Sequence, residues 1–353
     1  MSEPAILSVS DLRVWYGTEG DPVRAVDGVS LEIRSGETLG LVGESGCGKS
    51  TLGRGILGLL PDSAAVAGEV RFRARDLVGI APKRMRELRG PELALIFQEP
   101  MTRLDPLVTI EGHFLETLQA HELELEEDEM RRRSLAALAG MGIPPTRFKQ
   151  YPHEFSGGMR QRIMIALALV LNPKLVIADE PTTALDVIVE AQILRILADL
   201  RENFDTALLL ITHNLGIVAE SCNRVAVMYA GEIVEEGDAR QVFAEPAHPY
   251  TRELLRSTIS LSTTGLHYIP GAPPNLIDPP PACRFHPRCP NAMRVCAERH
   301  PIEVALGAGA TETGAGGQPR DRVSCWLHGP GSHVPPGGTQ PLKREEIAVA
   351  EEA

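Results

Sequence analysis

Alternating apolar and polar residues predict a pair of strands at the start of the chain. The alternation runs over residues 6–15 and again over residues 25–33, and it has the period of a strand with one buried face. The loop between them, residues 17–22, contains two glycines and a proline, which favour turns. We therefore expect an antiparallel strand pair here.

Other segments are more continuously apolar, as in strands that are buried on both faces of a parallel sheet. Such strands are predicted at 38–42, 91–97, 175–178 and 207–212, with a further strand at 66–73 and a hairpin around 231–237. Helices are predicted at 51–60, 109–140 and 163–171, and a short one begins at 247–251. This succession of strands and helices predicts an α/β fold.

Composition limits the class of protein. A length of 353 residues suits two domains, or one large domain with an appendage, and 43% hydrophobic residues can form a substantial core. The net charge of −12 argues against a broad basic surface, so no nucleic-acid partner is expected. Neither an export signal nor a run of about 18 apolar residues is present, which predicts a chain that stays in the cytosol.

The strongest chemical signal is the glycine-rich segment after the predicted strand 38–42. Its spacing fits the phosphate-loop pattern GxxxxGK[ST], in which backbone N–H groups surround a phosphate at a helix N-terminus. A chance match is disfavoured because the segment lies directly between a strand and a helix. The predicted nucleotide contacts are Gly43, Ser45, Gly46, Cys47, Gly48, Lys49, Ser50 and Thr51. Lys49 would reach the β and γ phosphates and Ser50 would ligate Mg²⁺.

Polar residues follow three of the predicted buried strands. Asp179 and Glu180 end one strand, where the first could hold Mg²⁺ and the second could polarise the attacking water. His213 and Gln98 follow two other strands. His213 could contact the γ-phosphate, and Gln98 could contact the metal ion. The alternative is that His213 is structural and Gln98 an ordinary strand end. Tyr16, at the end of the first strand, could stack on adenine or could simply be a core or edge aromatic residue.

A second helix start with anion-binding character lies at residues 156–158. Ser156 is a candidate N-cap, and Gly157 and Gly158 expose backbone N–H groups. One triphosphate rarely needs two such helix starts, so the second one suggests a nucleotide held by another subunit. The alternative is a simple capped helix.

Six segments in this order resemble the nucleotide-binding subunit of an ATP-binding cassette (ABC) transporter over about residues 5–260: GESGCGKST, Gln98, FSGGMRQR, LVIADEP, TTALD and ITHN. The resemblance implies a P-loop ABC-type domain with a RecA-like core, an antiparallel β subdomain and a helical signature subdomain. It implies ATP hydrolysis coupled to transport, with Mg²⁺ held through Ser50, Gln98 and Asp179. Glu180 would be the catalytic base and His213 the switch histidine.

The same resemblance implies a head-to-tail pair of ATPase subunits. Ser156, Gly157, Gly158 and the D-loop acid Asp186 would then contact ATP held by the second, non-identical ATPase chain. Two transmembrane permease subunits and a solute-binding protein complete such systems, with the ATPase peripheral on the cytoplasmic face of the membrane. A soluble ABC ATPase of DNA repair or translation is disfavoured, because one set of motifs and no long heptad run are present.

Two positions depart from the common family pattern. Met159 replaces a glutamine in the signature, although the peptide-transporter branch also uses FSGGM, and Asn214 replaces an acidic residue after the switch histidine. Neither position carries the catalytic side chain. We expect an active ATPase.

Residues 261–330 are rich in proline and cysteine and resemble the C-terminal extension of oligopeptide and dipeptide importer ATPases. This resemblance implies di- or oligopeptides as cargo, with nickel chelates, glutathione or sugars as alternatives among close relatives. The hydrolytic groups all lie outside the extension, which we therefore treat as separate from the ATPase core. Residues 331–353 are expected to form a mobile tail.

The extension carries Cys283, Cys289, Cys296 and Cys325, with five, six and twenty-eight residues between them. The CxxC pairs typical of structural zinc are missing, whereas a [4Fe–4S] cluster takes four cysteines without a tight pair. Some members of the resembled family carry such a cluster. Zinc and unligated thiols stay open as alternatives. Cys47 and Cys222 are expected to be small buried residues.

Overall fold

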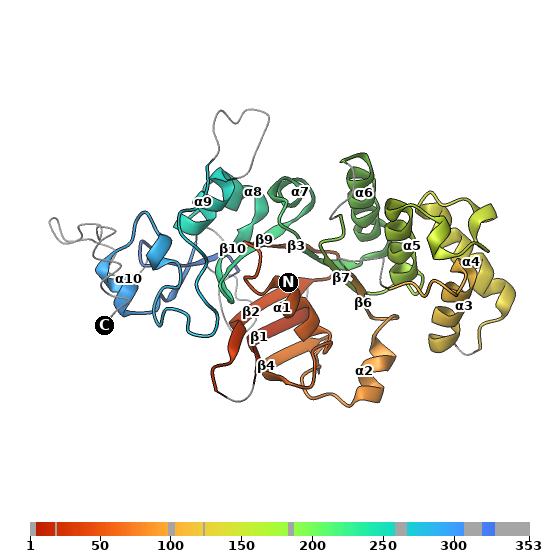
Figure 1. Ribbon diagram of the computed structural model, residues 1–353, viewed down its shortest axis with the longest axis horizontal. Coiled ribbons are helices and arrows are strands. Elements are labelled where there is room, and N and C mark those ends of the chain that lie inside the picture. The colour runs from red at the N-terminus through yellow and green to blue at the C-terminus, as the bar shows by residue number, and fades with distance from the viewer. Residues whose placement is uncertain are drawn as a thin grey trace. The chain divides into compact units, whose positions relative to one another are not determined.

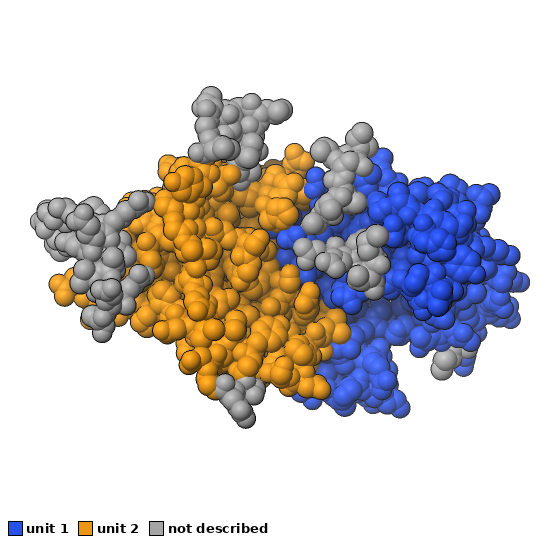
Figure 2. All heavy atoms as spheres, in the orientation of Figure 1, with its two compact units in different colours: residues 1–6, 33–38, 79–212 blue, residues 7–32, 39–78, 213–353 orange. Residues whose placement is uncertain are grey.

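The computed structural model describes residues 5–17, 20–97, 103–122, 124–182, 187–257, 267–306 and 320–328. Gln98, Asp186 and the predicted tail lie outside these residues. The chain forms two compact units (Figure 2). Unit 1 comprises residues 1–6, 33–38 and 79–212, and unit 2 comprises residues 7–32, 39–78 and 213–353.

Unit 1 contains a parallel sheet made of β6 (Leu93–Ile96), β7 (Leu175–Asp179) and β8 (Ala207–Ile211). Leu93 pairs with Leu175, and Leu175 pairs with Ala207. Every residue of β7 and β8 is buried, as expected of continuous apolar strands in a parallel sheet. The three predicted strands of this unit are confirmed.

The helices of unit 1 are α2 (Pro82–Leu88), α3 (Ile110–His121), α4 (Glu127–Gly140), α5 (Gly157–Leu169) and α6 (Val187–Phe204). Helices α3, α4 and α5 pack against one another (Figure 1). The single helical region predicted at 109–140 is two helices. The hydroxyl of Thr109 caps the first of them by accepting the Gly112 N–H at 3.1 Å.

One sheet of unit 2 has the strand order β2-β1-β4-β5. Its strands are β1 (Ala5–Tyr16), β2 (Val23–Arg34), β4 (Ala64–Phe72) and β5 (Arg75–Asp76), and β1 pairs antiparallel with β4. Helix α1 (Lys49–Ile56) packs on this sheet (Figure 1), and a Cβ on Gly55 would lie 3.2 Å from Val14. The predicted N-terminal strand pair is therefore part of a small antiparallel β subdomain.

In the other sheet of unit 2, β3 (Thr38–Val42) runs parallel to β9 (Arg224–Tyr229), and β10 (Glu232–Asp238) completes the predicted hairpin. The C-terminal extension adds β12 (Arg322–Ser324) next to β10 and β11 (Glu303–Ala305) next to β12. These two strands were not predicted. Helices α7 (Leu215–Ser221), α8 (Ala239–Ala244), α9 (Pro249–Arg256) and α10 (Arg294–Glu298) belong to the same unit.

The extension shares a hydrophobic core with the rest of unit 2. Ile269 and Phe285 of the extension pack in one cluster with Val42 of β3 and Tyr250 of α9. Residues of the extension therefore pack against β3, the strand that leads into the phosphate loop, and against α9. In the described part of the chain, no helix is both long and apolar enough to span a bilayer.

Candidate nucleotide-binding site

The phosphate loop links β3 to α1 and depends on glycine at both ends. Gly43 and Gly48 have φ angles of 154° and 108°. A Cβ on Gly43 would lie 2.1 Å from the Met228 carbonyl oxygen, and one on Gly48 would lie 2.0 Å from the Ala25 carbonyl oxygen. Any side chain here would therefore collide with backbone, so the loop can only keep this tight curve with glycine at both positions.

Lys49 is buried and reaches back across the loop. Its Nζ donates to the carbonyl oxygens of Gly43 and Glu44 at 2.8 and 2.9 Å and lies 3.7 Å from the sulfur of Cys47. Burial raises the pKa of the Cys47 thiol, although Lys49 opposes the shift. The loop therefore holds an ammonium group among backbone carbonyls, where a phosphate oxygen would be a stronger partner.

Sequence patterns missed two residues that hold this loop. Tyr250 accepts a hydrogen bond from the Glu44 N–H at 2.8 Å, and Arg288 forms an ion pair with the Glu44 carboxylate at 2.7 Å. The two residues lie more than 200 positions beyond Glu44 in the sequence. No local pattern could have indicated either contact.

The acidic pair lies at the end of β7 in unit 1. Asp179 is buried, and Glu180 is partly exposed with a φ angle of 47°. The Glu180 N–H donates to the Ile211 carbonyl oxygen at 2.8 Å, which continues the pairing with β8. A left-handed backbone is unfavourable for glutamate and turns its side chain away from the line of the strand. The two carboxylates are thus placed in different environments, as separate roles require.

The predicted second helix start is confirmed at α5. Ser156 is its N-cap, and its hydroxyl accepts the Met159 N–H at 3.4 Å. Ser156 and Gly157 are exposed, and a Cβ on Gly157 would have no atom within 4 Å. Arg147 donates to the Met159 sulfur at 3.3 Å, so methionine has a specific partner at this departure from the family pattern.

Helix α5 also contacts the segment that follows the acidic pair. The Gln161 side chain is buried and donates to the Pro181 carbonyl oxygen at 2.8 Å. This hydrogen bond joins two segments of unit 1 that carry predicted site residues. Sequence reasoning did not single out Gln161.

His213 and Asn214 lie at the start of α7 in unit 2. His213 is exposed, and the Asn214 side chain accepts the N–H groups of Gly216 and Ile217 at 3.1 and 3.5 Å. Asn214 is therefore a helix cap, a role that suits asparagine at least as well as an acid. Tyr16 is the last residue of β1 and is partly exposed.

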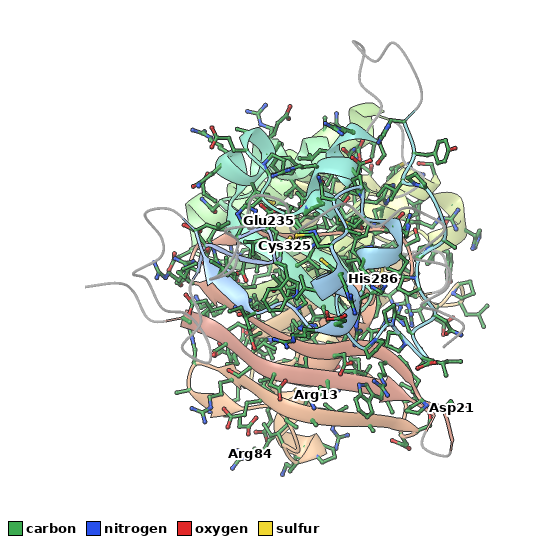
Figure 3. The ribbon with its side chains drawn as sticks, turned by 90° about the vertical axis from the view of Figure 1, so that its left-hand side faces the viewer. Arg13, Asp21, Arg84, Glu235, His286 and Cys325 are labelled. Atoms are coloured by element: carbon green, nitrogen blue, oxygen red, sulfur yellow. The ribbon has the colours of Figure 1, made fainter. Side chains whose placement is uncertain are left out.

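The four cysteines of the extension line one small cavity. Its other lining residues include His248, His286 and Trp326, and the cavity measures about 10 Å³ (Figure 3 labels His286 and Cys325). Burial raises the pKa of all four thiols, to about 12 for Cys289 and about 11 for Cys325. Among the described residues, no three His, Cys, Asp or Glu side chains are arranged to hold a metal ion.

Comparisons with known proteins identify the family of the chain. Residues 26–183 match the ABC transporter family, and residues 234–296 match the C-terminal region of oligopeptide and dipeptide transporters. The dipeptide transport ATP-binding protein DppD of Bacillus subtilis is 44% identical over 91% of this chain and 94% of its own length. The oligopeptide transport ATP-binding protein OppD of Escherichia coli is 45% identical over 85% of this chain and 90% of its own.

Solved structures show the same fold. A dimer of the ATP-binding cassette MJ0796 with ADP and Pi matches with a TM-score of 0.60 at 27% identity, over 66% of this chain and 99% of that one. The cassette CbiO1 of Clostridium perfringens, part of an ABC transporter complex, matches with a TM-score of 0.59 at 29% identity, over 69% and 92%. The chain therefore belongs to the oligopeptide and dipeptide family of ABC transporter ATP-binding subunits.

Proposed function

We propose that this chain hydrolyses ATP to power an importer of di- and oligopeptides. The observation that carries the proposal is the combination of a phosphate loop that admits only glycine at Gly43 and Gly48 with a matched peptide-transporter region at residues 234–296. The loop supplies nucleotide binding, which every ABC ATPase shares. The C-terminal region supplies the cargo class.

The loop binds the triphosphate through its backbone N–H groups and through Lys49, which exchanges two carbonyl partners for phosphate oxygens. Ser50, Asp179 and Gln98 would hold Mg²⁺, which neutralises charge on the phosphates when bound. Tyr16 would stack on the adenine ring.

Glu180 would act as the base that accepts a proton from the attacking water, and His213 would contact the γ-phosphate. The partial exposure of Glu180 supports this role, because a base must reach a water molecule. Asp179, which is buried, suits the separate role of a metal ligand.

The exposed start of α5 would complete a nucleotide site on a second, non-identical ATPase subunit through Ser156, Gly157 and Gly158, and Asp186 would also contact the ATP held there. Two permease subunits would be driven by closure and opening of the ATPase pair, and a solute-binding protein would deliver cargo. The chain would lie on the cytoplasmic face of the membrane. The names of DppD and OppD, which are ATP-binding proteins of peptide transport, support this assembly.

Glu180→Gln in the assembled importer tests the catalytic role. This substitution keeps the shape and hydrogen bonding of the side chain but removes the base, so ATP should still bind while hydrolysis falls by about 100-fold. The same change in both ATPase subunits controls for activity of the partner's site. Unchanged turnover in that double variant would exclude Glu180 as the base.

Cargo is tested by uptake into vesicles that contain the complete importer and its binding protein. Labelled di- and oligopeptides should accumulate in an ATP-dependent way, and Glu180→Gln should abolish uptake. Nickel chelates, glutathione and sugars are the competing cargoes. Uptake of one of these without uptake of peptides would overturn the peptide assignment.

We also propose that Cys283, Cys289, Cys296 and Cys325 hold a structural [4Fe–4S] cluster. The number and type of donors suit such a cluster, and the four thiols line one cavity, although in the described structure they are not arranged to hold a metal ion. About 10 Å³ is room for roughly one water molecule, so the thiols must move outward to admit a cluster. Such ligation would crosslink the proline-rich extension.

Iron and zinc analysis of protein purified without oxygen tests the cluster. About four irons per chain and broad absorbance near about 400 nm are expected, and Cys289→Ser should remove both. One zinc without iron would replace the cluster with a zinc site. If both iron and zinc are absent, the four cysteines are ordinary thiols.

A further inference from the structure

Glu44, the second residue of the phosphate loop, is fixed at three points. Its N–H donates to the Tyr250 hydroxyl at 2.8 Å, and its carbonyl oxygen accepts from Lys49 at 2.9 Å. Its carboxylate accepts from both terminal nitrogens of Arg288 at 2.7 and 3.0 Å. One loop residue is therefore held through its N–H, its carbonyl and its side chain together.

Arg288 reaches the loop from the C-terminal extension, where it ends the 3₁₀ turn His286–Arg288 just before Cys289. Its side chain is only 5% exposed. It also donates to the carbonyl oxygens of Ile269 and Pro270 at 3.3 and 3.0 Å. A buried guanidinium with a two-pronged carboxylate contact and further acceptors is rigidly oriented.

A guanidinium group keeps its charge at every physiological pH, and that of Arg288 faces the Glu44 carboxylate. Arg288 therefore stays charged. Burial raises the pKa of Tyr229 to about 12, so its hydroxyl stays protonated at 3.2 Å from Arg288. The ion pair is thus part of a permanently charged contact between the extension and the loop.

The tyrosine that holds the Glu44 N–H is itself fixed by aromatic packing. Tyr250 is fully buried, its ring centroid lies 4.5 Å from that of Tyr229, and Phe285 of the extension lies 5.3 Å away. Its hydroxyl cannot move without disturbing this cluster. The extension therefore supports the loop both through Arg288 and through the packing around Tyr250.

The far end of the loop has a similar support. The Gly231 N–H donates to the Cys47 carbonyl oxygen at 2.9 Å. Arg284, which directly follows Cys283, donates to the neighbouring Ala230 carbonyl oxygen and pairs with Glu232 at 2.9 Å. Arg288 thus contacts the phosphate loop directly, whereas Arg284 contacts the two neighbours of Gly231, the residue that hydrogen-bonds to Cys47.

We infer that Arg288 is a positioning residue for ATP, which orients the phosphate loop through Glu44 and neutralises its carboxylate. Without Arg288, a negative charge in the loop that surrounds the triphosphate would repel the ligand. An oriented loop also pays less ordering cost on binding. This inference rests on the proposed role of the loop in binding ATP.

The test measures ATP affinity of the full chain with a fluorescent ATP analogue. Arg288→Gln should raise Kd about 10-fold, and kcat of the assembled importer at saturating ATP should stay within about twofold. Glu44→Gln, which removes the charge, should restore most of the affinity when combined with Arg288→Gln. A residue that merely stabilised the extension would not be rescued by a change in the loop.

Arg294→Gln is the matched control, because Arg294 belongs to the same extension but forms an exposed ion pair, with its side chain 86% exposed. It should leave Kd unchanged. Arg288→Lys keeps the positive charge but can make only one contact with the Glu44 carboxylate, so it should raise Kd by only about threefold. This variant replaces Arg288→Gln in the test if Arg288→Gln does not fold.

Unchanged Kd in folded Arg288→Gln, or no recovery in the double variant, would overturn the inference. If Arg288→Gln does not fold, unchanged Kd in Arg288→Lys would do the same. Failure of the unaltered chain to bind the analogue would instead contradict the proposed function itself.

Discussion

The two helix starts that sequence patterns marked as anion sites are built in opposite ways. At α1, Gly48 is pressed against backbone and Lys49 is buried, and the loop before them is tied to distant residues. At α5, Ser156 and Gly157 are exposed, and a side chain on Gly157 would meet nothing. Residues of unit 2 contact the loop before the first helix start, whereas at the second start no atom of the described residues outside the helix lies within 4 Å of a Cβ on Gly157. This difference supports one nucleotide held by this chain and another presented by a partner.

Of the substitutions that compare the two helix starts, Lys49→Ala at α1 should have the largest effect on ATP binding. The substitution removes the proposed charged donor to the β and γ phosphates and should weaken ATP binding by about 10- to 100-fold. Fluorescent-ATP titration of the full chain measures it, with the exposed Lys83→Ala as control. Unchanged ATP affinity in Lys49→Ala would contradict the proposal that this segment is a phosphate-binding loop.

A matched pair of glycine substitutions compares the two starts by stability. Gly48→Ala places a Cβ against the Ala25 carbonyl oxygen at a left-handed φ and should cost about 3 kcal/mol or more in unfolding free energy. Gly157→Ala has open space at a helical position and should change the free energy by about 1 kcal/mol or less. Urea unfolding of both variants gives the comparison. Equal losses would contradict it.

Much of this arrangement follows from local sequence. The strand–loop–helix around Lys49 and the acidic end of β7 are determined by neighbouring residues, and so are recognisable as patterns. The short strands β11 and β12 have three residues each, too few to show a period. They form because β10 offers a free edge, which depends on the whole fold.

The separation of extension and ATPase core expected from sequence does not hold at the phosphate loop. Arg288 lies 244 residues from Glu44, and an arginine in a proline-rich segment has no pattern that names its partner. The contacts of Met159 and Asn214 could not be predicted from the sequence either. Their departures from the family pattern were visible in the sequence, but the contact with Arg147 and the capping of α7 needed the structure.

The most direct test of the difference between the two helix starts is Ser156→Arg in the Glu180→Gln chain, in which ATP should stay bound. The added side chain should block the exposed start of α5. Mass photometry with the partner ATPase and ATP should show loss of dimers, while the isolated chain keeps its ATP affinity. His153→Arg, an exposed change three residues earlier, should leave dimers intact. Loss of ATP affinity by the isolated Ser156→Arg chain, or normal dimers, would contradict the account.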